Sequence, residues 1–328
     1  MRRFAAAVIF IFLASPAAPA GFDGSFFETV LPVRRFMAPV PPVVCSVLPM
    51  NGVTWPPAMT AQDRAALTIA LNISGSFEGA DGWANLSDNF DGQGVSMGLL
   101  NQCLGQGSLQ PLLIKLRDAR PDVLTALVGP ERLRSLLAML ARWQVDAAGE
   151  AVPGPMSRFD APSEAAILTA PSANKASVNW AVANLYSGGK FDPAWKSELT
   201  ALASSPEYVS IQIAAAVEDH ERALAAQARL GVRELRAYLM LFDLVVQNGS
   251  LYPEDYADYD AFTRAKPGAD ATERLEKILE LRLRHVRRRF VADVRSRKRA
   301  IIRGTGAVHG TPRDLPGQYC YDGLWPYR

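Results

Sequence analysis

The sequence of 328 residues is poor in the residue types that mark disulfide-rich, metal-binding and nucleic-acid-binding proteins. It has three cysteines and no Cys-x-x-Cys pair, so we expect neither a disulfide scaffold nor a structural zinc site. Its three histidines lie far apart, and neither His-Glu-x-x-His nor Gly-x-Ser-x-Gly occurs, which argues against a zinc protease and a Ser-His-Asp hydrolase. A formal net charge of +2 is too small for a dedicated nucleic-acid binder. The sequence thus predicts no metal, no cofactor and no nucleic-acid partner.

Long apolar runs are also missing, except at the N-terminus. Arg2 and Arg3 precede an apolar stretch from Phe4 to Leu13, and small residues follow up to Ala20. This pattern is typical of a cleaved secretory signal peptide over residues 1–20 and predicts a periplasmic or secreted protein. Its removal would leave 33 basic and 33 acidic side chains, a formal charge of zero. Export would permit a disulfide among Cys45, Cys103 and Cys320, but the sequence does not select a pair.

The remaining chain has mainly helical patterns. Residues 21–58 are rich in proline and predict an extended leader, whereas Thr60 and Asp63 form a capping-box pattern that opens a helix ending near Glu78. A loop or short hairpin is expected over 81–95, and residues 59–310 are expected to form one mostly α domain, with 311–328 as a C-terminal tail. Further helices are predicted at 108–118, 130–145, 174–186, 193–203, 207–229, 232–247 and 270–298, with breaks at 149–155 and 249–267.

Two carboxylates are associated with the loop expected over 81–95, one just before it and one within it. Glu78 would end an apolar helix beside Phe77, where desolvation favours the protonated carboxyl that a general acid needs. Asp91 lies in the polar run Asn89–Gly94, where a carboxylate stays ionised more easily. One carboxyl in each kind of environment is the arrangement used in glycosidic cleavage. The alternative is a surface charge at a helix end and a turn residue.

The order of motifs resembles the chitosanase family, glycoside hydrolase family 46, and more broadly the lysozyme-like superfamily. After Glu78, the run Phe90-Asp-Gly-Gln-Gly94 is similar to the family's Gly-Asp-Gly-Arg-Gly loop, and a Ser followed by Gly-Leu-Leu is similar to its next segment. Tyr238–Gly249 is similar to a second family helix, and the basic helix from Arg282 to Arg299 is a third, weaker match. The resemblance implies a bilobed, lysozyme-like helical domain with a small β-hairpin or loop element near the active site.

By this resemblance, Glu78 matches the catalytic acid, Asp91 the base, and Ser96 a hydroxyl residue that helps to hold the attacking water in an inverting mechanism. The sequence departs from the family where Gln93 replaces an arginine and Asn248 a histidine. These replacements change the charge lining the expected cleft. The sequence therefore favours an exported glycoside hydrolase that cleaves the β-1,4-linked amino sugars of peptidoglycan. The alternatives are a chitosanase or, in another class, an inactive sugar-binding or envelope-scaffold protein on the same fold.

Several polar and aromatic residues are candidates for sugar contact. Asp243 and Gln247 share a helix face in an apolar stretch, so with Asn248 they could form a second wall of the cleft or an internal hydrogen-bond network. The other candidates for substrate binding are Trp83, Gln93, Asn101 and Gln102.

A basic run occupies residues 273–303, with twelve Lys or Arg and four acidic residues. Such a run is most often a solvated helix face with salt bridges. The functional alternative is electrostatic contact with an anionic envelope polymer or lipid surface.

Overall fold

The computed structural model describes residues 44–50, 52–148 and 172–328. The predicted signal peptide, most of the predicted leader and the predicted break at 149–155 lie outside these residues. The described α-helices are α1 (Ala61–Glu78), α2 (Gln110–Ala119), α3 (Pro121–Leu127), α4 (Pro130–Ala147), α6 (Ser172–Asn184), α7 (Pro193–Ser204), α8 (Pro206–Leu230), α9 (Leu235–Asn248), α10 (Pro253–Ala265), α11 (Ala271–Leu283), α12 (Val291–Arg303) and α13 (Leu315–Tyr319).

The strands are short and all pair antiparallel. Strands β1 (Leu86–Ser87), β2 (Ser96–Met97) and β3 (Gln102–Cys103) form one sheet with β2 in the centre. Two hairpins, β4 (Tyr186–Ser187) with β5 (Lys190–Phe191) and β6 (Thr305–Val308) with β7 (Thr311–Asp314), complete the β structure of the described residues. The predicted mostly α fold with a small β element near residue 90 is confirmed.

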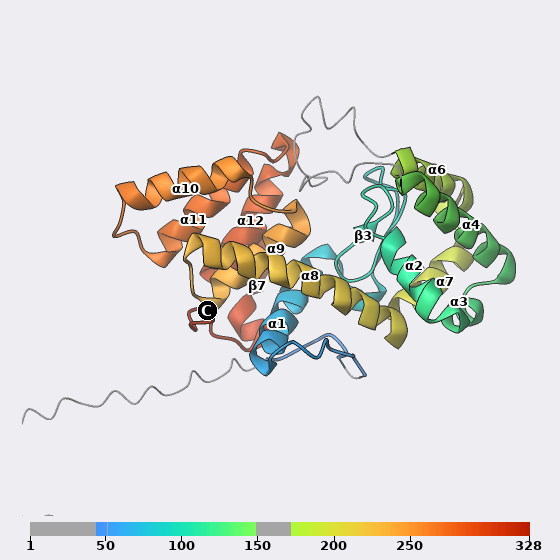
Figure 1. The fold of residues 1–328 in the computed structure, drawn as a ribbon, viewed down its shortest axis with the longest axis horizontal. Coiled ribbons are helices and arrows are strands. Elements are labelled where there is room, and N and C mark those ends of the chain that lie inside the picture. The colour runs from blue at the N-terminus through green and yellow to red at the C-terminus, as the bar shows by residue number, and fades with distance from the viewer. Residues whose placement is uncertain (1–43, 51, 149–171) are drawn as a thin grey trace, which may run out of the picture. The chain divides into compact units, whose positions relative to one another are not determined.

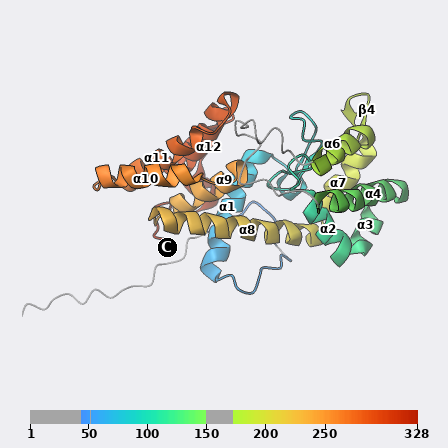
Figure 2. The ribbon, with the colours of Figure 1, turned by 45° about the horizontal axis from the view of Figure 1, so that its top comes forward.

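Two hydrophobic clusters form the core, and the helices that build them form two groups in Figure 1. The larger one gathers α1, α9, α11, α12 and α13, and the smaller one gathers α2, α3, α4, α6 and α7. Helix α8 contributes to both, with Ile213 in the larger cluster and Tyr208 in the smaller. Figure 2 shows α8 running from α9 toward α2, in agreement with its contacts to both helices. No helix in the described part of the chain is both long and apolar enough to cross a membrane.

Local signals explain where most helices begin. The predicted capping box at the start of α1 is half formed: Thr60 Oγ1 accepts a hydrogen bond from the backbone N–H of Asp63 at 3.1 Å, but the Asp63 carboxylate accepts the Thr60 hydroxyl at 2.7 Å instead of its backbone N–H. The segments predicted between residues 108 and 247 each overlap one described helix, α2, α4, α6, α7, α8 or α9.

The predicted break at 249–267 is wrong, since it contains α10. Pro253 stands at the first turn of this helix, where a missing N–H costs nothing, and Asp255 accepts the backbone N–H of Tyr252 at 3.0 Å. The single helix predicted at 270–298 is also wrong. It divides into α11 and α12 because Arg284 and His285 turn toward Asp255 of α10 and bind it at 2.8 and 3.0 Å.

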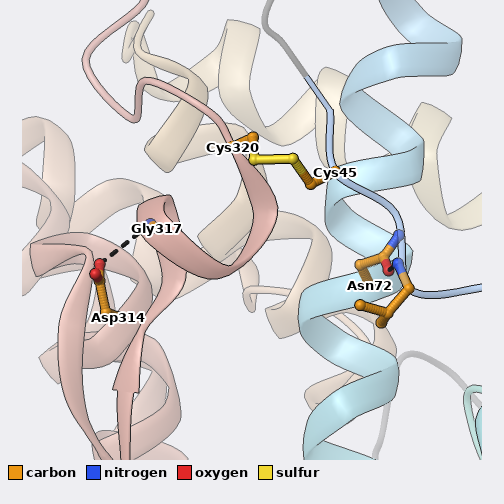
Figure 3. The surroundings of a disulfide bond; sticks show 6 residues. Cys45, Asn72, Asp314, Gly317 and Cys320 are labelled. Carbon is orange, nitrogen blue, oxygen red and sulfur yellow. Dashed lines mark hydrogen bonds between the residues drawn. A yellow bond between two sulfur atoms is a disulfide. The ribbon is translucent and has the colours of Figure 1, made fainter.

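A disulfide joins the two ends of the described chain. Cys45 and Cys320 are bonded (Figure 3), and Cys103 is a buried thiol outside this disulfide. Asn72 of α1 holds the adjoining segment by accepting a hydrogen bond from the backbone N–H of Val47 at 2.9 Å. The predicted boundary at residue 310 falls inside the β6–β7 hairpin, and the expected tail beyond it supplies side chains to the larger cluster. These are Leu315, Tyr319, Tyr321, Trp325 and Tyr327.

Candidate functional site

Glu78 is the last residue of α1, and its carboxylate is held on both oxygens. Oε1 accepts a hydrogen bond from Arg297 Nη1 at 2.7 Å, and Oε2 accepts one from Asn101 Nδ2 at 3.0 Å. The side chain is only 7% exposed. A charge-assisted bond on one oxygen and an amide on the other fix the direction in which the carboxylate points.

Asn101 ties Glu78 to one end of the three-stranded sheet. It occupies the turn between β2 and β3 with a φ of 51°, a left-handed conformation that Asn tolerates better than most residues. Its Oδ1 accepts a hydrogen bond from Asn85 Nδ2 at 2.8 Å, and the Asn85 carbonyl receives the N–H of Gly98 at 2.8 Å. Asn85 was not predicted as a site residue, although its position directly before a strand favours such a role.

Asp91 lies at the other end of the same sheet, in the loop between β1 and β2. Its Oδ1 accepts the backbone N–H of Gln93 at 3.2 Å, and the side chain is half-buried. The Gln93 carbonyl in turn receives the N–H of Gly105 at 3.1 Å, next to β3. Three residue-to-residue steps of nearly extended chain through β2, from Val95 to Gly98, separate the two ends of the sheet. They span about 10 Å at ~3.3 Å per residue.

Three other candidates line or flank this sheet. Ser96 stands in β2 opposite Ser87 and Cys103 and is 2% exposed. The Gln93 side chain accepts a weak bond from the Cys103 thiol at 3.4 Å. Gln102 stands in β3 opposite Met97 and is partly buried.

Trp83 belongs to the core side of the site. It is 3% exposed, packs in the larger cluster and donates its indole N–H to the carbonyl of Pro49 at 3.1 Å. It also lines a cavity of about 590 Å³ behind the end of α1, together with Asp81 and Leu99. Neither Glu78 nor Asp91 lines this cavity.

Asp243 belongs to a buried charge network that reaches Glu78 through Arg297. Asp243 is 0% exposed and binds Arg297 Nη2 and Lys298 Nζ, each at 2.7 Å. Burial alone would raise the pKa of Asp243, but the charges of Arg297 and Lys298 outweigh burial and hold it well below its usual range. Burial lowers the pKa of Lys298 to about 8, against the effect of the Asp243 charge. One guanidinium therefore orients two carboxylates at once.

Gln247 and Asn248 extend this interior on α9. Gln247 accepts a hydrogen bond from Lys298 and donates one to Asp293 at 3.0 Å. The carbonyl of Asn248, which is fully buried, accepts a bond from Arg282 at 2.6 Å. These contacts are those of an internal network, one of the two interpretations left open for this helix face.

Arg297 and Lys298 were not predicted as site residues, because they lie in the basic run that was interpreted mainly as a solvated face. They are 2% and 0% exposed. The signal that could have found them is Asp243 in an apolar helix, since a buried carboxylate requires a cationic partner. Within the described ranges, no three His, Cys, Asp or Glu side chains gather closely enough to hold a metal ion.

Comparison with known proteins gives structural matches but no sequence match. No protein-family model matches the chain, and no curated protein is similar to it. The glycoside hydrolase family 46 chitosanase of Gynuella sunshinyii, in complex with chitotetraose, is 20% identical, with a TM-score of 0.45 over 77% of this chain and 97% of that chain. The native chitosanase of Bacillus subtilis MY002 is 16% identical, with a TM-score of 0.46 over 79% of this chain and 98% of that one.

Both matched proteins are chitosanases, the family that the sequence motifs resemble. The resemblance is thus confirmed as a structural match over most of the chain at low sequence identity.

Proposed function

We propose that the protein is a glycoside hydrolase that cleaves a β-1,4-linked amino-sugar polymer, with Glu78 as general acid and Asp91 as general base. The observation that carries the proposal is the fixed carboxylate of Glu78, bound on one oxygen by Arg297 and on the other by Asn101. When Glu78 gives its proton to the leaving oxygen, these two donors stabilise the carboxylate that results.

The position of Asp91 supports inversion. A retaining enzyme needs its two carboxyl groups about 5–5.5 Å apart, because the second attacks the sugar directly. Glu78 is bound at one end of the sheet and Asp91 stands at the other, about 10 Å away along the backbone of β2, and this arrangement favours the wider carboxyl spacing that leaves room for a water molecule between base and sugar. Ser96, on the strand between these ends, is the proposed hydroxyl that helps to hold this water.

The local charge supports chitosan as the substrate over peptidoglycan. From residue 65 to residue 114 the chain contains four acidic side chains and no Lys or Arg. The acidic residues are Glu78, Asp81, Asp88 and Asp91. Arg297 balances the charge of Glu78, but Asp81, Asp88 and Asp91 would attract the ammonium groups of a glucosamine polymer and repel the peptide carboxylates of peptidoglycan. Nothing among the described residues favours peptidoglycan, so we propose a chitosanase activity.

Activity assays on both polymers test this proposal. The protein should release reducing sugars from chitosan and should leave the turbidity of purified cell walls nearly unchanged. The rate on chitosan should fall with added salt, because salt screens the attraction between the acidic residues and the ammonium groups. Glu78→Gln and Asp91→Asn should each lower kcat on chitosan at least about 100-fold, whereas Glu131→Gln, at an exposed site on α4, should retain activity. NMR of the first products should show the α-anomer if the reaction inverts.

Two results would contradict the proposal. A folded Glu78→Gln protein with full activity would remove the catalytic assignment. A wild-type protein that binds chitosan without cleaving it would favour the inactive sugar-binding or scaffold alternative.

We also propose that the protein is exported. The disulfide between Cys45 and Cys320 supports this, because such bonds persist mainly in oxidising compartments. Cell fractionation and N-terminal sequencing test it, with cleavage expected near Ala20. A full-length protein that remains in the cytoplasm would contradict it.

A further inference from the structure

The loop that carries Asp91, residues 88–95, is held together by its own side chains. Asp88 Oδ1 accepts the N–H of Phe90 at 3.1 Å, and Asn89 Oδ1 accepts the N–H of Gly94 at 2.7 Å. With the bond from Gln93 to Asp91, these contacts define the conformation of the loop. They do not fix its position relative to the rest of the protein, because all of them lie within it.

A tyrosine from a distant part of the sequence supplies an external contact. The hydroxyl of Tyr186 donates a hydrogen bond of 2.6 Å to the carbonyl of Gly94. Gly94 also lies against α6, where a Cβ atom would come within 3.2 Å of Val178 and Ala181. The loop therefore rests on α6 and is bound to the β4–β5 hairpin by the Tyr186 hydroxyl, in addition to the backbone bonds that Gln93 and Val95 accept from Gly105 and Leu104 beside β3.

Tyr186 is itself well fixed. Its ring packs edge-on against Phe191, its partner across the β4–β5 hairpin, with ring centroids 4.9 Å apart. The N–H of Asp192 closes the hairpin on the carbonyl of Leu185 at 2.8 Å. Burial, and then the charges of Asp88 and Asp91, raise the pKa of Tyr186 to about 12. The hydroxyl thus remains a donor throughout the pH range in which carboxyl groups perform acid-base catalysis.

We propose that Tyr186 is the positioning residue for Asp91: its bond to Gly94 sets the distance of the Asp91 carboxylate from the sugar on which Glu78 acts. This inference rests on the proposed function. It assigns to the β4–β5 hairpin, more than 90 residues away in sequence, a part in placing the general base. Loss of the hydroxyl should affect the chemical step more than substrate binding, because the base would still be present but displaced.

The test is Tyr186→Phe, which removes one oxygen and keeps the ring against Phe191. We expect kcat on chitosan oligomers to fall about 10-fold with KM changed less than about twofold, since small misplacements of a catalytic group are costly. Hydrogen exchange of a peptide covering 88–97 should become faster. The matched control is Tyr327→Phe, which removes a hydroxyl bonded to Asp63 at 2.8 Å at the start of α1 and should leave kcat and this exchange unchanged.

Asp91→Asn, measured in the same assays, distinguishes failure of the positioning role of Tyr186 from failure of the proposed function of Asp91 as base. If Asp91→Asn is inactive and Tyr186→Phe has wild-type kcat, or changes only KM, the positioning role is wrong and the proposed function stands. If Asp91→Asn is fully active, the proposed base is wrong, and the positioning role falls with it. Equal losses of kcat in Tyr186→Phe and Tyr327→Phe would also overturn the inference, because they would indicate a general loss of stability.

Discussion

Replacing Arg297 by methionine should destabilise the protein strongly. The methionine side chain fills much of the same space but leaves two carboxylates without the guanidinium that binds each at 2.7 Å. Asp243 would keep Lys298 and Glu78 would keep Asn101, so each retains one partner. The Asp243 and Glu78 side chains are 0% and 7% exposed, and water therefore compensates little.

Removing one partner of a buried ion pair costs about 3–5 kcal/mol, and we expect Arg297→Met to fall in this range because Glu78 loses the cation at 2.7 Å, whereas Asp243 keeps Lys298. In a domain of this size, that loss corresponds to a melting temperature lower by about 10 °C. The cost should depend on pH. Asp243 has a pKa held below its usual value of 3.8, so its contribution to stability is present above that value and is lost as the pH falls further. The difference between wild type and variant should therefore be full at pH 7 and shrink below pH 4.

Thermal and urea unfolding of Arg297→Met and Arg295→Met test this reasoning. Arg295 lies on the same helix but is 35% exposed, and its partner Glu280 is 45% exposed. A surface pair of this kind contributes less than about 1 kcal/mol. Similar small losses in both variants would refute the idea that the Arg297 network is buried and strongly coupled.

Three further substitutions have defined outcomes. Cys45→Ala opens a disulfide that spans 275 residues, so it should cost about 4–5 kcal/mol in unfolding experiments, and a melting temperature unaffected by reductant would contradict this. The pKa of Lys298 is lowered from 10.5 to about 8, so between pH 8 and 10.5 the unfolded chain binds more protons than the folded protein. The wild type should therefore gain stability relative to Lys298→Met as the pH rises through this range, which urea unfolding at several pH values measures. Gly79→Ala would place a Cβ atom 2.0 Å from Asn85 Oδ1 and disturb the amide pair that holds Glu78, so kcat should fall about 10-fold. Gly268→Ala, with no atom within 4 Å, is its control, and equal activity of the two variants would contradict the expected disturbance.

Local signals in the sequence predicted the parts of the fold that depend on neighbouring residues. Thr60 and Asp63 are three positions apart, so the sequence identifies Thr60 as the N-cap of α1, where its hydroxyl accepts the Asp63 backbone N–H. The same reasoning failed at α10, because Pro253 both breaks a preceding segment and begins a new helix. The prediction of one continuous helix failed after Leu283, where α11 ends and Arg284 and His285 bind Asp255 of α10.

The residues of the site also divide into those that local motifs identify and those that only tertiary contacts reveal. Glu78 and Asp91 were identified from motifs that each lie within a few residues. Arg297 binds Glu78 across 219 positions of sequence, and no local pattern distinguishes it from the exposed arginines beside it. The need for a buried cation could be inferred from Asp243, because its carboxylate lies in an apolar helix. Tertiary packing determined that this cation is Arg297.

Basic residues predominate in 273–303 and acidic residues in 65–114, but the contacts of these side chains determine how much of their charge a partner would meet. Of the twelve cations in residues 273–303, Arg282, Arg297 and Lys298 are at most 2% exposed, and others on α12 bind the carboxylates of Glu276 and Glu280. An anionic polymer that approached this run would have to compete with those carboxylates, so contact with an anionic envelope through 273–303 stays a prediction with reduced charge to drive it. The acidic residues between 65 and 114 have no basic neighbour in their own segment. Arg297 pairs with Glu78, so the negative charge that would attract the proposed cationic substrate lies mainly on Asp81, Asp88 and Asp91, and the proposed preference for chitosan depends on these three carboxylates.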